Sequence, residues 1–315
     1  MAVYTHLTDD EIADFLSAYP VGRLIKCEPV LEGAAHTIYH LTTMEDQYIL
    51  RLYEPITDPQ TIPFAINFMQ HLSENGIPCP LPIRNHQGAY IGTIRRKPAT
   101  LISFLPGHSP DPIAPDHAFQ VGQTLGRLHR FGEGFKQHLE NPFGQARWQD
   151  WFGAVEDYID GIQAGLASVM REELEYLQEN WPSHLPTGAI HADLSWDNVL
   201  FEGKTITGVL DFDFACTDLL ALDLCITLNF WGFRRRKAPD RALMGSLIRG
   251  YETVRHITPE EKQVFPFRMR AAAMRFLSSR VHDHLKMPPD ALIVPRDPHE
   301  YITILQHHRT VSDFS

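Results

Sequence analysis

The proline-rich segment PGHSPDPIAP, residues 106–115, constrains the fold of this chain more than any other sequence feature. Proline fixes φ and lacks a backbone donor, so neither a helix nor a central strand can run through it. The residues before it alternate as strands do, whereas most of those after it have helical spacing. We therefore predict a crossing between a strand-rich lobe, residues 1–105, and a mainly helical lobe, residues 106–315.

The first lobe carries recognisable start and stop signals. Thr8 and Glu11 form a capping box that predicts a short amphipathic helix. Residues 28–53 favour β-strands, and residues 62–74 favour a helix that ends at Asn-Gly. A hairpin is predicted around NHQGAY, followed by an apolar strand in KPATLISFLPG.

The second lobe is helical except between residues 187 and 214, where short β-like runs interrupt the pattern. Hydrophobic residues make up 43% of the chain and charged residues 21%, as in a globular protein. An antiparallel sheet followed by helices predicts a two-lobed α+β fold with the active site between the lobes.

Charge and composition exclude several functions. A net charge of -11 disfavours sequence-independent binding to nucleic acid, which needs a basic surface. No apolar run is long enough to cross a membrane, and the polar, acidic start is unlike a signal peptide. The four cysteines are scattered and include no Cys-x-x-Cys pair. We expect a cytoplasmic protein without membrane or nucleic-acid partners, acting on a small molecule.

Two acidic clusters flank a strand–turn–strand unit. HADLSWDN places His191, Asp193 and Asn198 before the first strand, and LDFDFA places Asp211 and Asp213 after the second. The hairpin brings these clusters side by side. Carboxylates gathered in this way need a cation, and hard oxygen ligands suit Mg²⁺.

Asp and Asn also favour turns for local reasons, and a single one would mean little. The complete set around two apolar β-runs instead favours a site. An aspartate that is not used for metal can accept a proton from a substrate hydroxyl. The pattern therefore predicts phosphoryl transfer from a nucleoside triphosphate to an alcohol.

His191-x-Asp193-x₄-Asn198 has the spacing of the protein-kinase catalytic loop, and Asp211-Phe-Asp213 stands where those enzymes have Asp-Phe-Gly. The chain more closely resembles the aminoglycoside phosphotransferase and choline kinase family, and within it the bacterial homoserine kinase group. The phrases that carry this resemblance, in chain order, are EGAAHTIYHLTT, YILRLYE, PFAINFMQHLSENGIPCPLPI, KPATLISFLPG, LGRLH, HADLSWDNVLF and LDFDFACTDLLALDL.

The resemblance implies a protein-kinase-like fold that binds ATP and Mg²⁺. It makes Asp193 the catalytic base, His191 the brace of the catalytic loop, and Asn198 and Asp211 the Mg²⁺ ligands. Residues 32–37, with Gly33 and His36, would cover the phosphates, and Arg51 would bind them. The backbone of Ser103, Phe104 and Leu105 would bind the adenine.

Three features depart from the family pattern. The phosphate loop EGAAHT has one glycine, Arg51 replaces the usual lysine, and residues 61–63 lack the expected acidic partner for that cation. What holds Arg51 is therefore open. Asp218 and Asp223 follow the metal motif, and either could brace the catalytic loop or cap the next helix.

A zwitterionic acceptor needs a cation for its carboxylate and an acid for its ammonium group. Arg234 is a candidate for the first, Asp213 for the second, and Trp231 for a further acceptor contact. We expect an ATP-dependent kinase that makes O-phospho-L-homoserine. The alternatives are a kinase for another amino alcohol, a sugar or an aminoglycoside, or a catalytically silent nucleotide-binding regulator. The sequence leaves the oligomeric state open.

Overall fold

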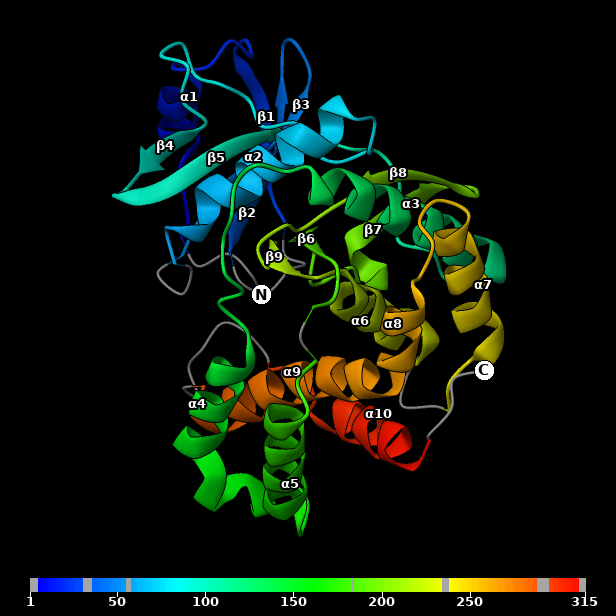
Figure 1. The fold of residues 1–315 in the computed structure, drawn as a ribbon. Coiled ribbons are helices and arrows are strands. Elements are labelled where there is room, and N and C mark those ends of the chain that lie inside the picture. Colours follow the sequence, from blue (N-terminus) through cyan, green and yellow to red (C-terminus); the bar gives the residue numbers. More distant parts are fainter. Residues whose placement is uncertain are drawn as a thin grey trace.

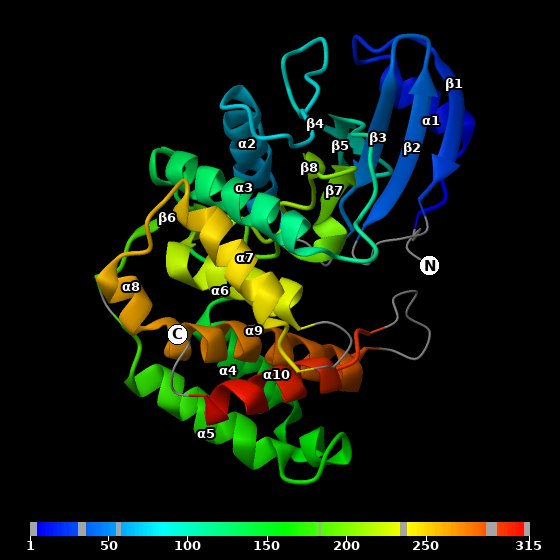
Figure 2. The ribbon, with the colours of Figure 1, turned by 90° about the vertical axis from the view of Figure 1, so that its right-hand side faces the viewer.

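The computed structural model describes residues 5–30, 36–54, 58–182, 184–233, 238–287 and 295–311. Figures 1 and 2 show a sheet with two helices at one end of the molecule and a larger, mainly helical body below it. We call the elements from α1 to β5 the sheet lobe and those from α3 to α10 the helical lobe. The predicted two-lobed α+β architecture is confirmed.

The sheet lobe is built on five antiparallel strands in the order β1-β2-β3-β5-β4. The capping box of Thr8 and Glu11 starts α1 as predicted. Ile12 of this helix and Leu41, Leu50 and Leu101 of the sheet form a small core. The elements are α1 (Asp9–Leu16), β1 (Leu24–Pro29), β2 (Thr37–Thr43), β3 (Gln47–Leu52), α2 (Thr61–Glu74), β4 (Ile91–Ile94) and β5 (Lys97–Ser103).

The hairpin predicted around NHQGAY lies elsewhere. Asn85 does form a turn there, because its Oδ1 accepts two backbone N–H groups, but that turn precedes β4. The hairpin joins β4 to β5 through Arg95 and Arg96, whose φ angles are 47° and 65°. Such turns usually use Asn-Gly. Here Arg95 forms a two-pronged ion pair with Glu11, at 2.6 and 2.8 Å, which holds the turn against α1.

Helix α2 packs into the core of the helical lobe. Phe64 and Phe68 contact Phe135, with ring centroids 5.4 and 5.1 Å apart. Phe68 also meets Phe212, which lies between the two aspartates of the second acidic motif, at 6.0 Å. The predicted helix is confirmed, and its apolar face connects the sheet lobe to the candidate site.

The helical lobe surrounds two small antiparallel sheets, one of β6 and β9 and one of β7 and β8. Helix α6 is buried along its whole length. The elements are α3 (Pro115–Glu133), α4 (Gln145–Val155), α5 (Leu166–Glu179), β6 (Thr187–Ile190), β7 (Val199–Glu202), β8 (Thr205–Val209), β9 (Cys216–Leu219), α6 (Leu220–Gly232), α7 (Arg241–Glu252), α8 (Pro259–Gln263), α9 (Phe265–Lys286) and α10 (His299–Thr310). In the described part of the chain no helix is long and apolar enough to cross a membrane.

Two glycines let α3 and α7 meet at backbone distance. A Cβ atom on Gly122 would lie 2.0 Å from the Leu247 carbonyl oxygen. One on Gly250 would lie 2.0 Å from the Phe119 carbonyl oxygen. Any larger side chain at either position would separate the helices.

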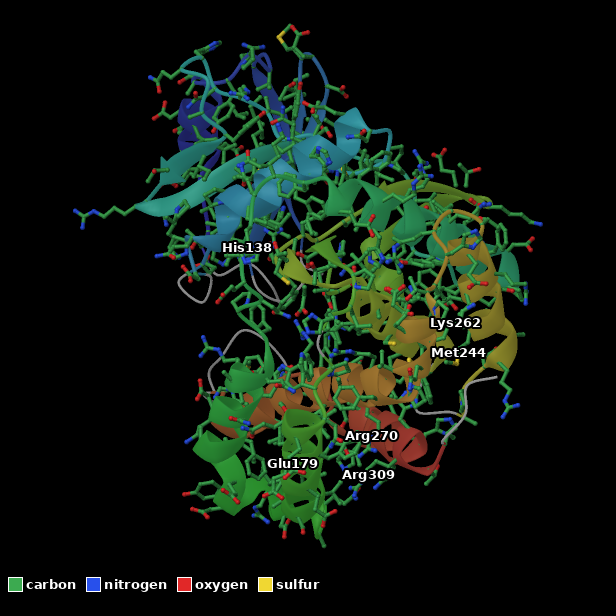
Figure 3. All side chains as sticks on the ribbon, viewed as in Figure 1. His138, Glu179, Met244, Lys262, Arg270 and Arg309 are labelled. Atoms are coloured by element: carbon green, nitrogen blue, oxygen red, sulfur yellow. The ribbon has the colours of Figure 1, made fainter. Side chains whose placement is uncertain are left out.

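An ion-pair cluster fixes the lower helices of Figure 1. Arg270 of α9 donates two hydrogen bonds to Glu173 of α5, at 2.7 and 2.6 Å. Arg309 of α10 donates to Glu172 at 2.8 Å. Figure 3 labels both arginines where α9 and α10 lie side by side. Glu173 is fully buried, so this pairing satisfies a charge that would otherwise be costly.

The crossing segment is attached to the hairpin of β7 and β8. His108 and Phe201 exchange backbone hydrogen bonds of 3.2 and 2.9 Å. Thr207 Oγ1 donates to the Pro106 carbonyl at 2.6 Å. Gly107, at φ 119°, allows this approach, because a Cβ there would lie 2.4 Å from Thr207 Oγ1.

Candidate active site

The loop after β6, residues 191–198, is held from below by Asp223 of α6. One carboxylate oxygen accepts the His191 N–H at 2.9 Å, and the other accepts the Ala192 N–H at 2.8 Å. His129 Nε2 also contacts Asp223, at 3.1 Å. Ala192 has φ 61°, a left-handed conformation that needs such support. Asp223 is therefore a brace of this loop.

Asp218 has a different place. It accepts one hydrogen bond from the Asn141 side chain and one from the backbone N–H of the next residue, Leu219, both at 2.7 Å. The sequence left bracing of the loop and capping of the next helix as equal alternatives for these acids. Asp223 accepts hydrogen bonds from the loop, whereas those that Asp218 accepts come from Asn141 and Leu219.

His191 connects the two acidic motifs. Its Nδ1 accepts the Asp193 N–H at 3.2 Å, so the ring proton is on Nε2, which donates to the Leu210 carbonyl at 2.9 Å. The ring is fully buried, and burial lowers its pKa, which keeps it neutral. His191 thus contacts both acidic motifs, and its bracing role stays a prediction.

Asp193 and Asn198 lie together at the two ends of the loop. Asn198 Nδ2 donates to the Asp193 carbonyl at 2.8 Å and to its carboxylate at 3.2 Å. Burial raises the pKa of Asp193 to about 8, and the charge of Arg275 is the largest influence that opposes this rise. A carboxyl group with a pKa near neutrality is suited to exchange a proton with a substrate hydroxyl.

Asp211 faces the loop from the second motif. The Leu210 N–H donates to the Asn198 carbonyl at 2.8 Å, which brings the two predicted metal ligands close together. Asp211 keeps 39% of its side chain exposed, while burial and the charge of Asp213 raise its pKa. Asp211 shares its cationic neighbour Arg51, 3.4 Å away, with Asp213, and is the more exposed of the two carboxylates.

The donor set fits Mg²⁺. Within the described ranges, no residue donates to Asn198 Oδ1, because only the amide nitrogen is used. Those ranges also contain no group of three or more His, Cys, Asp or Glu able to hold a metal. A cation here would depend on Asn198, Asp211 and oxygen atoms from a bound nucleotide, the environment that Mg²⁺ favours.

Arg51 of β3 is held by the second motif. Its Nη2 pairs with the Asp213 carboxylate and lies 3.4 Å from Asp211. His36 Nε2 contacts the same Asp213 oxygen at 2.6 Å. Burial alone would raise the pKa of Asp213, but Arg51 and His36 outweigh it and hold the pKa at about 2. Asp213 thus fills the place of the acidic helix residue missing from residues 61–63.

This pairing corrects the suggestion that Asp213 meets an acceptor ammonium group. Its carboxylate is 14% exposed and is engaged by Arg51 and His36 across the two lobes. Trp231 is also placed differently from the prediction. It is fully buried and donates its indole N–H to the Leu194 carbonyl at 3.1 Å, so it supports the loop and has no surface for an acceptor.

At the end of β5, where adenine was predicted to bind, two of the three backbone N–H groups already donate hydrogen bonds within the protein. The Ser103 and Phe104 N–H groups donate to the carbonyls of Leu81 and Gln47, at 2.9 and 3.2 Å. The Leu105 N–H has no acceptor among the residues described, and this makes it the donor open to a base. Gly33 and Arg234, also predicted site residues, lie outside the described residues.

Two residues of the site were missed from sequence. Arg275 and Tyr301 lie near Asp193 although they come from the last two helices. The sequence RMRAAAMRF contained a signal for Arg275. Arg268 and Arg275 are seven residues apart, so they lie on the same face of the helix, and most of the residues between them are apolar.

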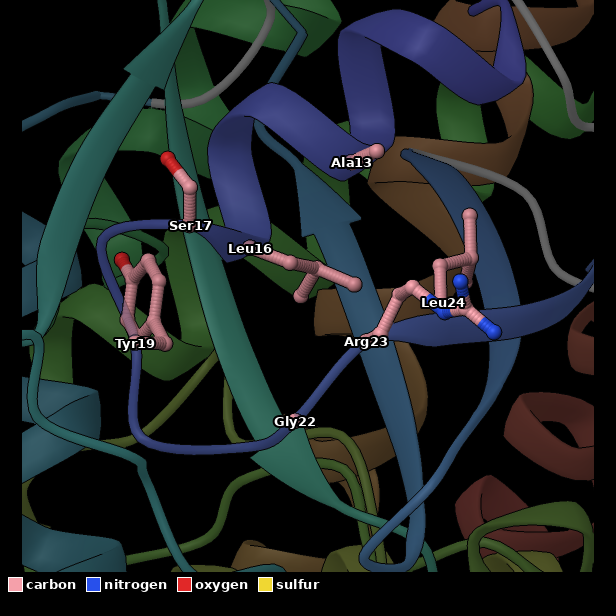
Figure 4. Close-up of a pocket in the computed structure, with 7 residues that line it drawn as sticks. All are labelled: Ala13, Leu16, Ser17, Tyr19, Gly22, Arg23 and Leu24. Carbon is pink, nitrogen blue, oxygen red and sulfur yellow. The ribbon is translucent and has the colours of Figure 1, made fainter.

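A surface hollow on the sheet lobe is separate from all of these residues. Figure 4 shows it between the end of α1 and the start of β1. Its lining residues are Ala13, Leu16, Ser17, Tyr19, Gly22, Arg23 and Leu24.

Comparison with known proteins agrees with this geometry. Residues 26–257 match the sequence model of the phosphotransferase enzyme family. The chain belongs to this family. It is 41% identical over 311 residues to a homoserine kinase of Sinorhizobium fredii, covering 99% of this chain and 95% of that one. It is 40% identical over 313 residues to a homoserine kinase of Methylobacterium radiotolerans, covering 99% and 98%.

Solved structures show the same fold at low sequence identity. Amicoumacin kinase hAmiN, in complex with AMP-PNP, Ca²⁺ and Ami, aligns with a TM-score of 0.72 at 14% identity, covering 96% of this chain and 92% of that one. A microcompartment-associated aminopropanol kinase aligns with a TM-score of 0.67 at 17% identity, covering 96% and 94%. The phosphotransferase chain described here therefore has the kinase fold predicted from its motifs.

Proposed function

We propose that this phosphotransferase transfers the γ-phosphoryl group of ATP to the hydroxyl of L-homoserine, in the cytoplasm and with Mg²⁺. The observation that carries the proposal is the arrangement of Asp193, Asn198 and Asp211 around one small volume. The near full-length similarity to homoserine kinases favours this acceptor over other alcohols.

Asp193 is proposed as the base. Its carboxylate accepts the acceptor's hydroxyl proton and orients the oxygen toward the γ-phosphorus. The hydrogen bond from Asn198 fixes the direction of the carboxylate, and His191 and Asp223 fix the loop that carries it. Positioning of this kind is the main contribution of the protein to phosphoryl transfer.

Asn198 and Asp211 would hold Mg²⁺, which, when bound, neutralises phosphate charge. Arg51 is placed beside Asp211 and can exchange its contact there for a phosphate oxygen. Asp213 keeps the guanidinium at the site before that exchange. The ion pair with Asp213 therefore holds the Arg51 guanidinium in place although α2 lacks the usual acidic residue.

The test is coupled ADP release from ATP with homoserine, choline, methylthioribose and an aminoglycoside as acceptors. We expect release with homoserine at a rate at least a hundredfold above that with the others. An Asp193→Asn variant measured in parallel identifies ATP hydrolysis that does not depend on the site. Turnover of another acceptor with homoserine inert would reject the acceptor, and ATP binding without turnover of any acceptor would indicate a regulator.

A further inference from the structure

Arg275 is a buried cation that has no acidic partner among the residues that the structure describes. Its side chain, on α9, is 3% exposed, and its Nη2 has no hydrogen-bond partner in the described chain. A buried arginine left unpaired destabilises a protein by several kcal/mol unless something neutralises it. The absence of a protein partner therefore suggests that a ligand supplies the negative charge.

The neighbouring arginines are already paired. Three arginines lie within electrostatic reach of Tyr301. Arg280 pairs with Glu300 at 2.5 Å, and Arg296 pairs with Asp197 at 2.9 Å. Among the residues that the structure describes, only Arg275 of these three has no carboxylate within ion-pair distance.

The Tyr301 hydroxyl is a second unused donor, and its ring is connected to Arg275 through the ring of Phe276. It is buried, and no described group accepts from it. The Arg275 guanidinium lies 4.0 Å from the centre of the Phe276 ring, and that ring stacks on Tyr301 at 5.1 Å. A planar guanidinium and a nearby hydroxyl are the groups that proteins use to bind a carboxylate.

Arg275 lies beside the second acidic motif, because its guanidinium is 4.7 Å from the ring of Phe214, the residue that follows Asp213. Burial lowers the pKa of Arg275, and the Asp193 charge is the largest influence opposing that fall. The rings that cover the guanidinium, Phe143 and Phe214, at 5.3 and 4.7 Å, belong to loops and are only half-buried. Because Arg275 is 3% exposed, a carboxylate reaches it only when these half-buried rings move.

We propose that Arg275, assisted by the Tyr301 hydroxyl, binds the carboxylate of the acceptor and makes the site selective for a hydroxylated amino acid. This inference rests on the proposed function. An amino alcohol that lacks the carboxylate would leave Arg275 unpaired and would be a poor substrate for that reason. The cation fills the role for which the sequence suggested Arg234.

The experiment compares homoserine with 3-aminopropan-1-ol, which is homoserine without its carboxylate. In Arg275→Gln we expect kcat/KM for homoserine to fall about 100-fold, as when one partner of a buried ion pair is removed. The fall in kcat/KM for 3-aminopropan-1-ol should be at least about tenfold smaller, because that acceptor feels only the loss of the Arg275 charge near Asp193, and the KM for ATP should be unchanged. Arg275→Lys should recover part of the homoserine activity, because lysine keeps the positive charge but cannot donate two parallel hydrogen bonds to a carboxylate as the planar guanidinium does.

Two further variants separate recognition from folding. Tyr301→Phe removes only one oxygen atom and should raise the KM for homoserine about fivefold, with no change for the amino alcohol. Arg268→Gln is the matched control. Arg268 is also buried and unpartnered on α9, but it packs on Trp181, 4.1 Å away, and should affect stability without changing the KM for homoserine.

The outcomes are distinct. Equal losses for both acceptors in Arg275→Gln, or the same rise in KM in Arg268→Gln, would overturn the carboxylate site and leave the proposed function standing. Failure of the wild-type enzyme to release ADP with homoserine would reject the proposed function and the carboxylate site with it. Calorimetry of homoserine with the enzyme and a non-hydrolysable ATP analogue gives the same comparison without turnover.

Discussion

Replacement of Asp223 by Asn tests how the catalytic loop is held. The carboxylate accepts three hydrogen bonds, from the N–H groups of His191 and Ala192 and from His129, all fully buried. Asn has one acceptor oxygen, so its NH₂ group must face at least one of these donors. One charge-assisted bond is lost at about 2 kcal/mol, and the other two weaken to neutral ones.

The expected loss is therefore about 3 kcal/mol of unfolding free energy. For a chain of this size that corresponds to a fall in Tm of roughly 6 °C. Activity should fall further, because Ala192 precedes Asp193, the proposed base, and loses the bond that holds its left-handed backbone. A displacement of about 1 Å at the reacting groups costs on the order of 100-fold in kcat.

The assays are urea unfolding followed by circular dichroism and ADP release at saturating substrates. Asp218→Asn is the control, because that acid bonds only Asn141 and Leu219, and it should lose less than about 1 kcal/mol. Wild-type kcat in Asp223→Asn, or equal losses in both variants, would refute the bracing role.

Four further predictions concern the charged groups Asp193, Asp211 and Asp213. In Asp193→Asn, kcat should fall at least about 1,000-fold with ATP binding unchanged. Since the folded pKa of Asp193 is raised to about 8, wild type loses stability as pH rises from about 4 to 8. Metal-free Asp193→Asn should therefore have a higher Tm than wild type at pH 8 and an equal one at pH 4. Asp211→Ala should raise the Mg²⁺ concentration for half-maximal rate about tenfold or more, and an unchanged requirement would exclude it as a ligand. Asp213→Asn should raise the KM for ATP about tenfold, because Arg51 loses its main anchor, and an unaffected KM would contradict that role.

The sequence predicted local structure best where the contacts that determine it join residues close together in the chain. The spacing of His191, Asp193 and Asn198 needs only one loop and one strand to bring their groups together. The capping box that starts α1 likewise involves Thr8 and Glu11 alone. In both cases the residues that contact one another are at most five positions apart, although Asp223 also holds the loop at residues 191–198.

Contacts that depend on tertiary packing were not predicted from the sequence. The ion pair of Arg51 with Asp213 joins residues 162 positions apart, and no local pattern states that pairing. Trp231 looked available for a ligand because sequence does not show which face of a uniformly apolar helix meets the catalytic loop. The hairpin at Arg95 was misplaced because its turn is held by a distant carboxylate rather than by turn-forming residues.

The attachment of the crossing segment to the hairpin of β7 and β8 limits how the lobes can pivot. From Pro106 onward the crossing is hydrogen-bonded to the hairpin between Asn198 and Asp211, the proposed metal ligands, so it moves with the helical lobe. A rotation of the sheet lobe must then be absorbed by the short stretch between Ser103 and Leu105. Those same residues carry the backbone proposed to bind adenine, so base recognition and the angle between the lobes depend on the same few torsions.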